Sequence, residues 1–343
     1  MKDSFRVILH IGPHKTGTTY IQRNLLDNRA ALAKVGVIYP EVFCEKPGHH
    51  ALYRAVLRSP RTIATDLEAL LQQLRKQGQT AIFSSETLSH LGETEMGVLR
   101  AALSPVPVQT VMYLRARGPV IWSQWQEDVK HGETRSFSEY VTDLMLRTPE
   151  AKSINPLGLA VRSQRALGSL KLVDYEACVA SGIDLIEPLL QLAADGPILL
   201  PHLNTYRVNS RMPQERVEVL RLLNLIAYRR LKRHPGILVR KLFLTALRNS
   251  AEVREATAEV GTLIGSQLVE LPLDLLDEYF WPRDEGHTAF LQAAGVEVPP
   301  FGVLRETKGL DRTGFKYLPD ISFLLSPLLP AVIEIYDMLD IQR

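Results

Sequence analysis

Short apolar runs alternate with helix-like patterns along the first half of the chain. Runs with strand character start at Val7, Gln79 and Val106, and the last of them is rich in β-branched residues. Between these runs, apolar residues recur at spacings of three and four, as on one face of a helix. Strands that alternate with helices in this way predict a parallel sheet with right-handed crossovers. We therefore expect the α/β class, as a three-layer α/β/α fold around a central parallel sheet.

The same patterns set the elements that we expect over the whole chain. Besides the strand from Val7, strands are expected at residues 37–39, 79–84, 106–114 and 170–175. Helices are expected at residues 18–34, 62–76, 93–103, 119–131, 184–194, 214–230, 236–248, 251–267, 283–294 and 326–341. The second half is mostly helical. We therefore expect an α/β core at residues 1–200 and a helical extension at residues 201–343, packed on the core as one continuous domain.

The strand from Val7 runs into a turn with the sequence Gly12-Pro13-His14-Lys15-Thr16-Gly17-Thr18-Thr19. The backbone N–H groups of Lys15 to Thr19 are expected to point into one concavity, and the next helix adds its unpaired first-turn donors. Lys15 adds a full charge, so the sequence predicts a phosphate cradle. In the nucleotide-triphosphatase P-loop the lysine follows the second glycine, whereas here it precedes Gly17. This order indicates a related loop for another phosphate ester.

Two further strand exits carry polar side chains, and in parallel sheets ligands bind at the carboxyl ends of the strands. Glu86 follows the strand at 79–84, where a carboxylate can accept the proton of an attacking hydroxyl. A helix-capping role for Glu86 is the alternative, and His14 is the rival base. Arg115 follows the strand at 106–114, and with the Ser123 hydroxyl it suits a phosphate monoester.

Arg117 lies two residues beyond Arg115 and is the alternative phosphate ligand at the same exit. A surface arginine and a helix-face serine would leave this exit without a ligand-binding role.

These segments resemble the sulfotransferases that use 3′-phosphoadenosine-5′-phosphosulfate. Residues 10–19 are similar to their 5′-phosphosulfate-binding loop. Tyr113-Leu114-Arg115 followed by Ser123 is similar to their 3′-phosphate-binding segment, including the spacing of eight residues from the arginine to the serine. Shorter similarities to bacterial-type members occur at residues 84–86, 173–176 and 208–210. The resemblance spans roughly residues 5–225 and thins beyond them.

The resemblance implies a P-loop-like nucleotide-binding core and transfer of a sulfuryl group to an acceptor hydroxyl. It implies that the donor is 3′-phosphoadenosine-5′-phosphosulfate, that the product is adenosine 3′,5′-bisphosphate, and that the acceptor is a glycan, a glycolipid or a small alcohol. In related glycan sulfotransferases a glutamate at the matching exit is the base, which implies this role for Glu86. The nucleotide-binding residues implied are Lys15, Thr16, Gly17, Thr18, Thr19, Arg115 and Ser123, with Lys15 and either Glu86 or His14 as catalytic groups.

The composition bears on the class of partner and on the cellular compartment of the protein. The chain has 40 basic and 38 acidic residues, a formal charge of +2, which does not indicate a nucleic-acid-binding protein. Cys44 and Cys178 lie far apart, without metal-binding or disulfide spacing, which suits a reducing cytoplasm. The sequence shows no signal-like start and no run of the about 18 to 20 apolar residues that span a bilayer. We therefore expect a cytoplasmic protein. We also expect no metal ion, because a transferring sulfuryl group carries less negative charge than a γ-phosphoryl group.

Two segments, residues 229–244 and 308–317, each allow two interpretations. Residues 229–244 are basic and apolar, which fits either contact with an anionic membrane or polyanion or a solvated face of a packed helix. Residues 308–317 form a Lys/Gly-containing segment, either a loop that closes over the 3′-phosphate or an ordinary turn. The alternative functions are an ATP-dependent phosphotransferase with a P-loop-like core and a non-catalytic nucleotide-binding protein.

Overall fold

The computed structural model describes residues 5–147, 155–194, 196–203, 212–232, 234–267, 269–270, 274–300 and 316–317. The chain forms two compact units that interleave along the sequence. The first comprises Met1–Val120, Glu150–Val208 and Leu276–Lys308, and the second comprises Ile121–Pro149, Asn209–Leu275 and Gly309–Arg343. The division expected at residue 200 followed chain order alone and stays a prediction.

The first unit is built on a five-stranded sheet, and this confirms the expected α/β class and the parallel arrangement. The strands are β1 (Arg6–His10), β2 (Val37–Ile38), β3 (Thr80–Ser84), β4 (Val108–Leu114) and β5 (Leu170–Asp174), in the order β2-β3-β1-β4-β5. All neighbouring pairs run parallel. The central β1 therefore has β3 on one side and β4 on the other, and the exits of all three strands lie at one edge of the sheet.

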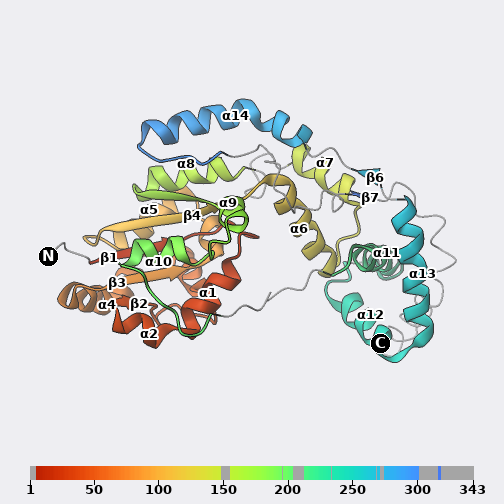
Figure 1. Ribbon diagram of the computed structural model, residues 1–343, viewed down its shortest axis with the longest axis horizontal. Coiled ribbons are helices and arrows are strands. Elements are labelled where there is room, and N and C mark those ends of the chain that lie inside the picture. The colour runs from red at the N-terminus through yellow and green to blue at the C-terminus, as the bar shows by residue number, and fades with distance from the viewer. Residues whose placement is uncertain are drawn as a thin grey trace. The chain divides into compact units, whose positions relative to one another are not determined.

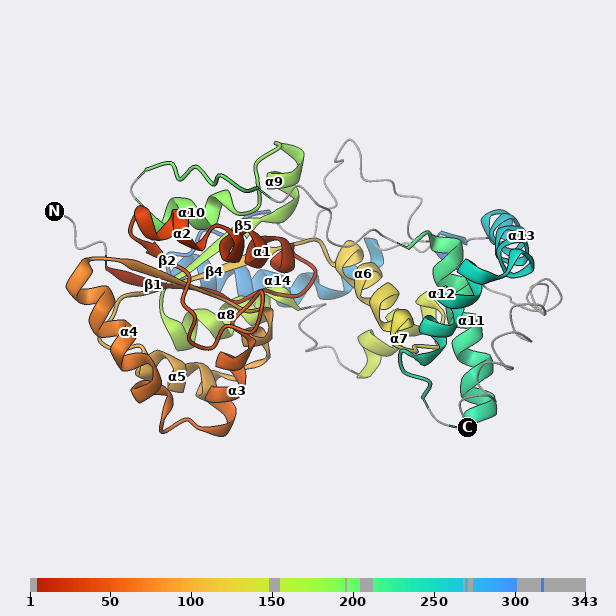
Figure 2. The ribbon, with the colours of Figure 1, turned by 90° about the horizontal axis from the view of Figure 1, so that it is seen from below.

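Helices cover both faces of this sheet (Figures 1 and 2). Along β1 the alternation of the strand places Val7 and Leu9 in one buried cluster and Ile8 in the other. The first cluster is covered by α3 (His50–Arg58), α4 (Ile63–Gln77), α5 (Glu93–Ala102) and α8 (Pro156–Leu167). The second is covered by α1 (Thr18–Asp27), α2 (Arg29–Lys34), α9 (Tyr175–Ala180) and α10 (Glu187–Ala193). The α/β/α layering follows from these two apolar faces.

Some boundaries differ from the expectation for local reasons. The helix expected at 18–34 is two helices, because the Asn28 side-chain amide donates to Asn24 O at 2.9 Å and to His202 O at 2.8 Å. Helix α3 begins at His50, whereas the sequence predicts a loop over residues 44–55. Helices α7 (Phe137–Arg147) and α8 were not expected. The helix expected at 326–341 lies outside the described residues.

The second unit is helical. It holds most of α6 (Arg117–Lys130), together with α7, α11 (Gln214–Leu231), α12 (Leu238–Asn249) and α13 (Ala251–Gln267). Strands β6 (Val269–Glu270) and β7 (Lys316–Tyr317) pair antiparallel in this unit. Of the predicted loop at 308–317, the structure describes only β7. Helix α14 (Asp274–Ala293) passes from the second unit into the first.

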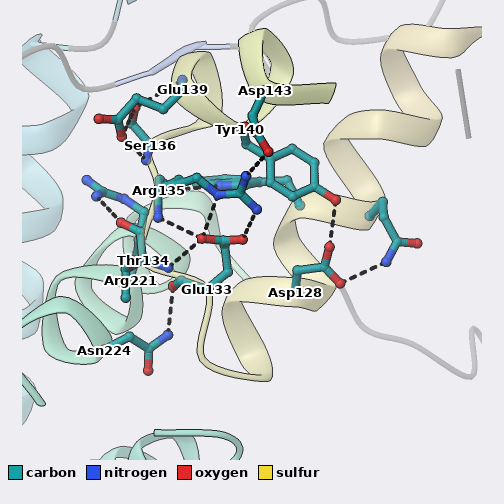
Figure 3. Close-up of polar contacts among 12 residues, drawn as sticks. Asp128, Glu133, Thr134, Arg135, Ser136, Glu139, Tyr140, Asp143, Arg221 and Asn224 are labelled. Carbon is teal, nitrogen blue, oxygen red and sulfur yellow. Dashed lines mark hydrogen bonds and ion pairs between the residues drawn. The ribbon is translucent and has the colours of Figure 1, made fainter. Parts of the chain in front are cut away.

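A polar network fixes the turn between α6 and α7 in the second unit (Figure 3). The guanidinium of Arg135 lies between the carboxylates of Glu133 and Asp143 and over the ring of Tyr140, 5.1 Å from its centroid. From α11, Arg221 donates to Thr134 O and Asn224 donates to Glu133 O, both at 3.1 Å. The turn is therefore held by the ion pairs of Arg135 and by hydrogen bonds from side chains of α11 to its main-chain oxygens.

Among the described helices, none combines the length and the apolar character that crossing a bilayer requires.

Candidate functional site

The loop between β1 and α1 has the backbone geometry of an anion cradle. Gly12, Lys15 and Gly17 have φ angles of 88°, 66° and 81°, in the left-handed region that lysine rarely adopts. Gly17 is the N-cap of α1, and no side chain caps that helix end. The first-turn N–H groups, which have no partner within the helix, are thereby left for a ligand.

The predicted loop residues divide into different roles. The Thr16 hydroxyl donates to Pro13 O at 2.7 Å and is fully buried, so it closes the loop on itself. Only the backbone N–H of Thr16 remains suited to an anion. Thr18 is buried, whereas Thr19 is partly exposed in the first turn of α1. The role of Lys15 as the charged ligand of this loop stays a prediction.

The exit of β3 packs directly on the loop. A Cβ added at Gly12 would lie 3.1 Å from Cα of Glu86, so only glycine allows this approach without displacement. Glu86 begins the short helix η1 (Glu86–His90). Its Oε2 accepts a hydrogen bond of 2.7 Å from Nε2 of Gln22 and lies 4.0 Å from Nδ1 of His50. The sequence-predicted base and phosphate loop are therefore in contact.

The carboxyl group of Glu86 is held in its ionised form. Burial raises its pKa, but the hydrogen bonds from its own backbone N–H and from Gln22 lower it, as do the charges of His50 and His14. The lowering contributions prevail, and the pKa lies below its ordinary value. The group is therefore deprotonated at neutral pH, which is the form that a general base needs, while the lowered pKa makes it a weaker base.

The histidines near the strand exits have different roles. His14 and His90 approach each other, with 3.0 Å between their Nε2 atoms. Burial lowers the pKa of His10 to about 4, and His10 Nδ1 contacts Ser84 Oγ at 2.8 Å. Burial likewise lowers the pKa of His49 to about 4; this side chain bonds to Pro40 O and accepts from the Ser84 N–H. His10 and His49 are neutral groups of the fold, and His14 remains beside Glu86 as the rival base.

At the exit of β4, Arg115 supports the loop. Its Nη1 donates to Lys15 O at 2.6 Å, its Nε lies 3.6 Å from Glu176 Oε1, and its guanidinium lies 4.7 Å from the Tyr175 ring centroid. The side chain is 9% exposed. Its guanidinium therefore ties the phosphate loop to the start of α9, a role that the sequence did not indicate.

The alternative ligand at this exit, Arg117, is engaged elsewhere. Its side chain is fully buried, and Nη2 donates to both carboxylate oxygens of Asp284 at 2.6 Å. This contact favours Arg115 over Arg117 as the arginine at the site. Ser123 lies in the second turn of α6, among the residues of the second unit. The pairing of Arg115 with Ser123 on one phosphate stays a prediction, and Asn209-Ser210 lie outside the described residues.

The structure adds residues to the site that sequence reasoning missed. Gln22 and His50 contact Glu86, and Glu176 contacts Arg115. A signal for Gln22 was present, because it lies four residues after Thr18 and hence on the same helix face as the loop. His50 gave no signal beyond its place in a His-containing loop, since its role depends on the packing of α3 against η1.

Among the residues that the structure describes, no group of three or more His, Cys, Asp or Glu side chains is placed to hold a metal ion. Comparisons with protein-family models, curated proteins and solved structures give no match for this chain.

Proposed function

We propose that the chain is a cytoplasmic sulfotransferase with a P-loop-like core, which moves a sulfuryl group from 3′-phosphoadenosine-5′-phosphosulfate to an acceptor hydroxyl of a carbohydrate or another alcohol. The observation that carries the proposal is the packing of Glu86, held ionised, against Gly12 of the loop that contains Lys15. An anion cradle with a general base directly beside it suits group transfer to a hydroxyl better than simple nucleotide binding.

The residues present fit the donor. The left-handed backbone at Lys15 and Gly17 and the uncapped start of α1 form a cradle for the 5′-phosphosulfate. Arg115 and Ser123 are the proposed ligands of the 3′-phosphate. When bound, the donor supplies the sulfuryl group and leaves as adenosine 3′,5′-bisphosphate.

In the transfer step, Glu86 takes the proton from the acceptor hydroxyl. The acceptor oxygen forms a bond to sulfur while the bond between sulfur and the bridging phosphate oxygen breaks. Lys15 and the backbone N–H groups of the loop stabilise the negative charge that develops on that bridging oxygen. This charge is smaller than in γ-phosphoryl transfer, so the step is proposed without a bridging metal ion.

Calorimetry and a transfer assay test the proposal together. We expect binding of adenosine 3′,5′-bisphosphate in preference to ATP with Mg²⁺, and transfer of labelled sulfuryl groups to an acceptor in fractionated cell extract. Lys15→Ala should lower the turnover by about 10² to 10³-fold. Glu86→Gln should lower it by about 10² to 10⁴-fold, with the affinity for the bisphosphate retained.

Two outcomes would replace the proposal. Preferred binding of ATP with Mg²⁺ would identify a phosphotransferase. Binding of the bisphosphate without transfer to any acceptor fraction would identify a non-catalytic nucleotide-binding protein.

A further inference from the structure

The side chain of Gln22 is buried against the proposed base. Gln22 lies in the second turn of α1 and is 1% exposed. Its Nε2 donates to Oε2 of Glu86 at 2.7 Å. The amide nitrogen, and not the amide oxygen, has to face the carboxylate, because two acceptor oxygens would repel each other. The contact therefore fixes the orientation of both side chains.

A tight turn holds the amide of Gln22 from the other side. A Cβ added at Gly48 would lie 2.7 Å from Cδ of Gln22 and 2.9 Å from both its Nε2 and its Oε1. Gly48 is itself fixed by two main-chain hydrogen bonds with Glu45, of 2.8 and 3.1 Å. The next residue, His49, donates its N–H to Ser84 O at 2.8 Å, at the end of β3. Gln22 is thus enclosed between this turn and Glu86.

We infer that Gln22 is a positioning residue for the base: its amide occupies Oε2 of Glu86 and leaves Oε1 to take the proton from the acceptor hydroxyl. The role in proton transfer rests on the proposed function, whereas the contact with Glu86 does not. Gly48 helps to hold Gln22 in this position, because any larger residue at 48 would displace the side-chain amide of Gln22.

The titratable groups that interact with Glu86 come from several elements. His50 belongs to α3, His14 to the loop and His10 to the end of β1, and Tyr39 follows β2. His10 is neutral at physiological pH because burial lowers its pKa to about 4. Gln22 and the backbone N–H of Glu86 are the uncharged donors to this carboxylate, so their contributions do not change with pH between 5 and 8.

The test replaces the donor without changing the shape of the side chain. In Gln22→Met we expect the ¹³C carboxyl signal of Glu86, assigned with Glu86→Gln, to titrate about one pH unit higher than in the wild type. We expect kcat to fall by about tenfold to a hundredfold, because the base is no longer held in place. The affinity for adenosine 3′,5′-bisphosphate should stay within about twofold, since Gln22 does not contribute to the cradle.

Gly48→Ala provides a second variant that changes neither Gln22 nor Glu86, and it keeps the inference testable where Gln22→Met does not fold. It should shift the titration of Glu86 in the same direction. Gln72→Met is the matched control, because Gln72 donates to Glu68 at 3.2 Å on the exposed face of α4. It should change neither the titration of Glu86 nor kcat.

An unchanged titration of Glu86 in Gln22→Met would overturn the inference. A shifted titration with an unchanged kcat would also overturn it, since Gln22 would then adjust the charge without positioning the base. If the titration shifts in Gln22→Met but the wild-type protein transfers no sulfuryl group, the proposed function and the role in proton transfer are overturned, and the contact between Gln22 and Glu86 alone is supported.

Discussion

At the scale of single residues, the proposed base has two candidates with different titration behaviour. Glu86 is held ionised beside the loop, and His14 lies in the loop and contacts His90. Both groups were candidates from the sequence. The structure gives each a distinct environment, so the pH dependence of the reaction separates them.

We expect kcat/KM to stay level from pH 8 down to about pH 5. The active form of Glu86 is deprotonated, and its pKa lies below the ordinary value of 4.5, so protonation removes activity only as the pH falls below that value. A base at His14 would instead lose activity as its imidazole gains a proton, which for histidines usually happens between about pH 5 and 8. The measurement is the pH profile of the transfer rate at low acceptor concentration.

Arg115 combines a structural contact with a proposed ligand contact. Its hydrogen bond to Lys15 O acts on the whole loop, whereas a contact with a 3′-phosphate acts on that phosphate alone. We expect Arg115→Ala to lower the affinity for adenosine 5′-monophosphate by about tenfold and the affinity for adenosine 3′,5′-bisphosphate by about a hundredfold. The loss is larger for the bisphosphate because its 3′-phosphate also loses a charge-assisted hydrogen bond. Calorimetry measures both. Equal losses for the two ligands would show that Arg115 does not bind the 3′-phosphate.

At the scale of elements, the start of α1 depends on a glycine. Gly17 has a φ of 81°, and a Cβ added there would lie 2.7 Å from Cδ1 of Leu185. Gly78, which ends α4, has a φ of 62°, and nothing lies within 4 Å of an added Cβ. The two positions therefore share the backbone strain and differ in the steric contact.

We expect Gly17→Ala to lower the free energy of unfolding by about 2 to 4 kcal/mol, the sum of left-handed strain and a packing conflict. Gly78→Ala should lower it by about 1 kcal/mol, from the strain alone. Urea denaturation measures both variants. Equal effects would mean that Leu185 yields to the added methyl group without cost.

The basic segment at 229–244 is used mainly for packing in the second unit. Helix α12 buries Val239, Leu242, Phe243 and Ala246, which leaves Ile237 as a large apolar residue exposed beside Lys241. The apolar part of the segment is therefore mostly unavailable to a bilayer.

We expect weak attraction of the protein to vesicles that contain anionic lipid, by charge alone. The bound fraction should be lost between about 0.05 and about 0.5 M salt, because screening acts strongly on exposed charges. Sedimentation with anionic and neutral vesicles measures it, with Lys241→Gln expected to reduce the bound fraction. Binding that persists at high salt would show insertion of apolar side chains.

At the largest scale, the first unit includes helix α14, which comes from far along the sequence. Asp284 on α14 pairs with Arg117 at the start of α6, across 167 residues of sequence. Burial raises the pKa of Asp284 although the charge of Arg117 lowers it, so desolvation outweighs the attraction between them. Such a pair specifies where α14 docks more than it stabilises the fold.

We expect Arg117→Met or Asp284→Leu alone to lower the free energy of unfolding by about 3 to 5 kcal/mol, because each variant removes one half of a buried ion pair and keeps the other charge buried. The double variant should recover most of this loss. Thermal or urea unfolding of the three variants measures the coupling. Additive losses in the double variant would show that the two side chains act independently.

The class of fold and the position of the loop between β1 and α1 could be predicted from local patterns in the sequence. The strands β1, β3, β4 and β5 lie within about two residues of their expected positions, because apolar, β-branched runs and the turns that end them are local properties. The strand, glycine turn and helix around Lys15 were likewise readable, since backbone donors at a helix start are set by neighbouring residues. Helices α3, α7 and α8 were not predicted, although each has an apolar face that the fold buries.

Contacts between distant segments of the chain bring the polar residues of the site together. Glu86 and Gln22 lie 64 residues apart, and Arg115 and Lys15 lie 100 residues apart, yet each pair forms a hydrogen bond. The strand order β2-β3-β1-β4-β5 brings these residues to one edge of the sheet. Arg115 and Arg117 are both candidates for this strand exit in the sequence, and the structure separates them by what packs against each. The role of a charged side chain depends on its burial and its partners, and these are set by segments that are distant along the chain.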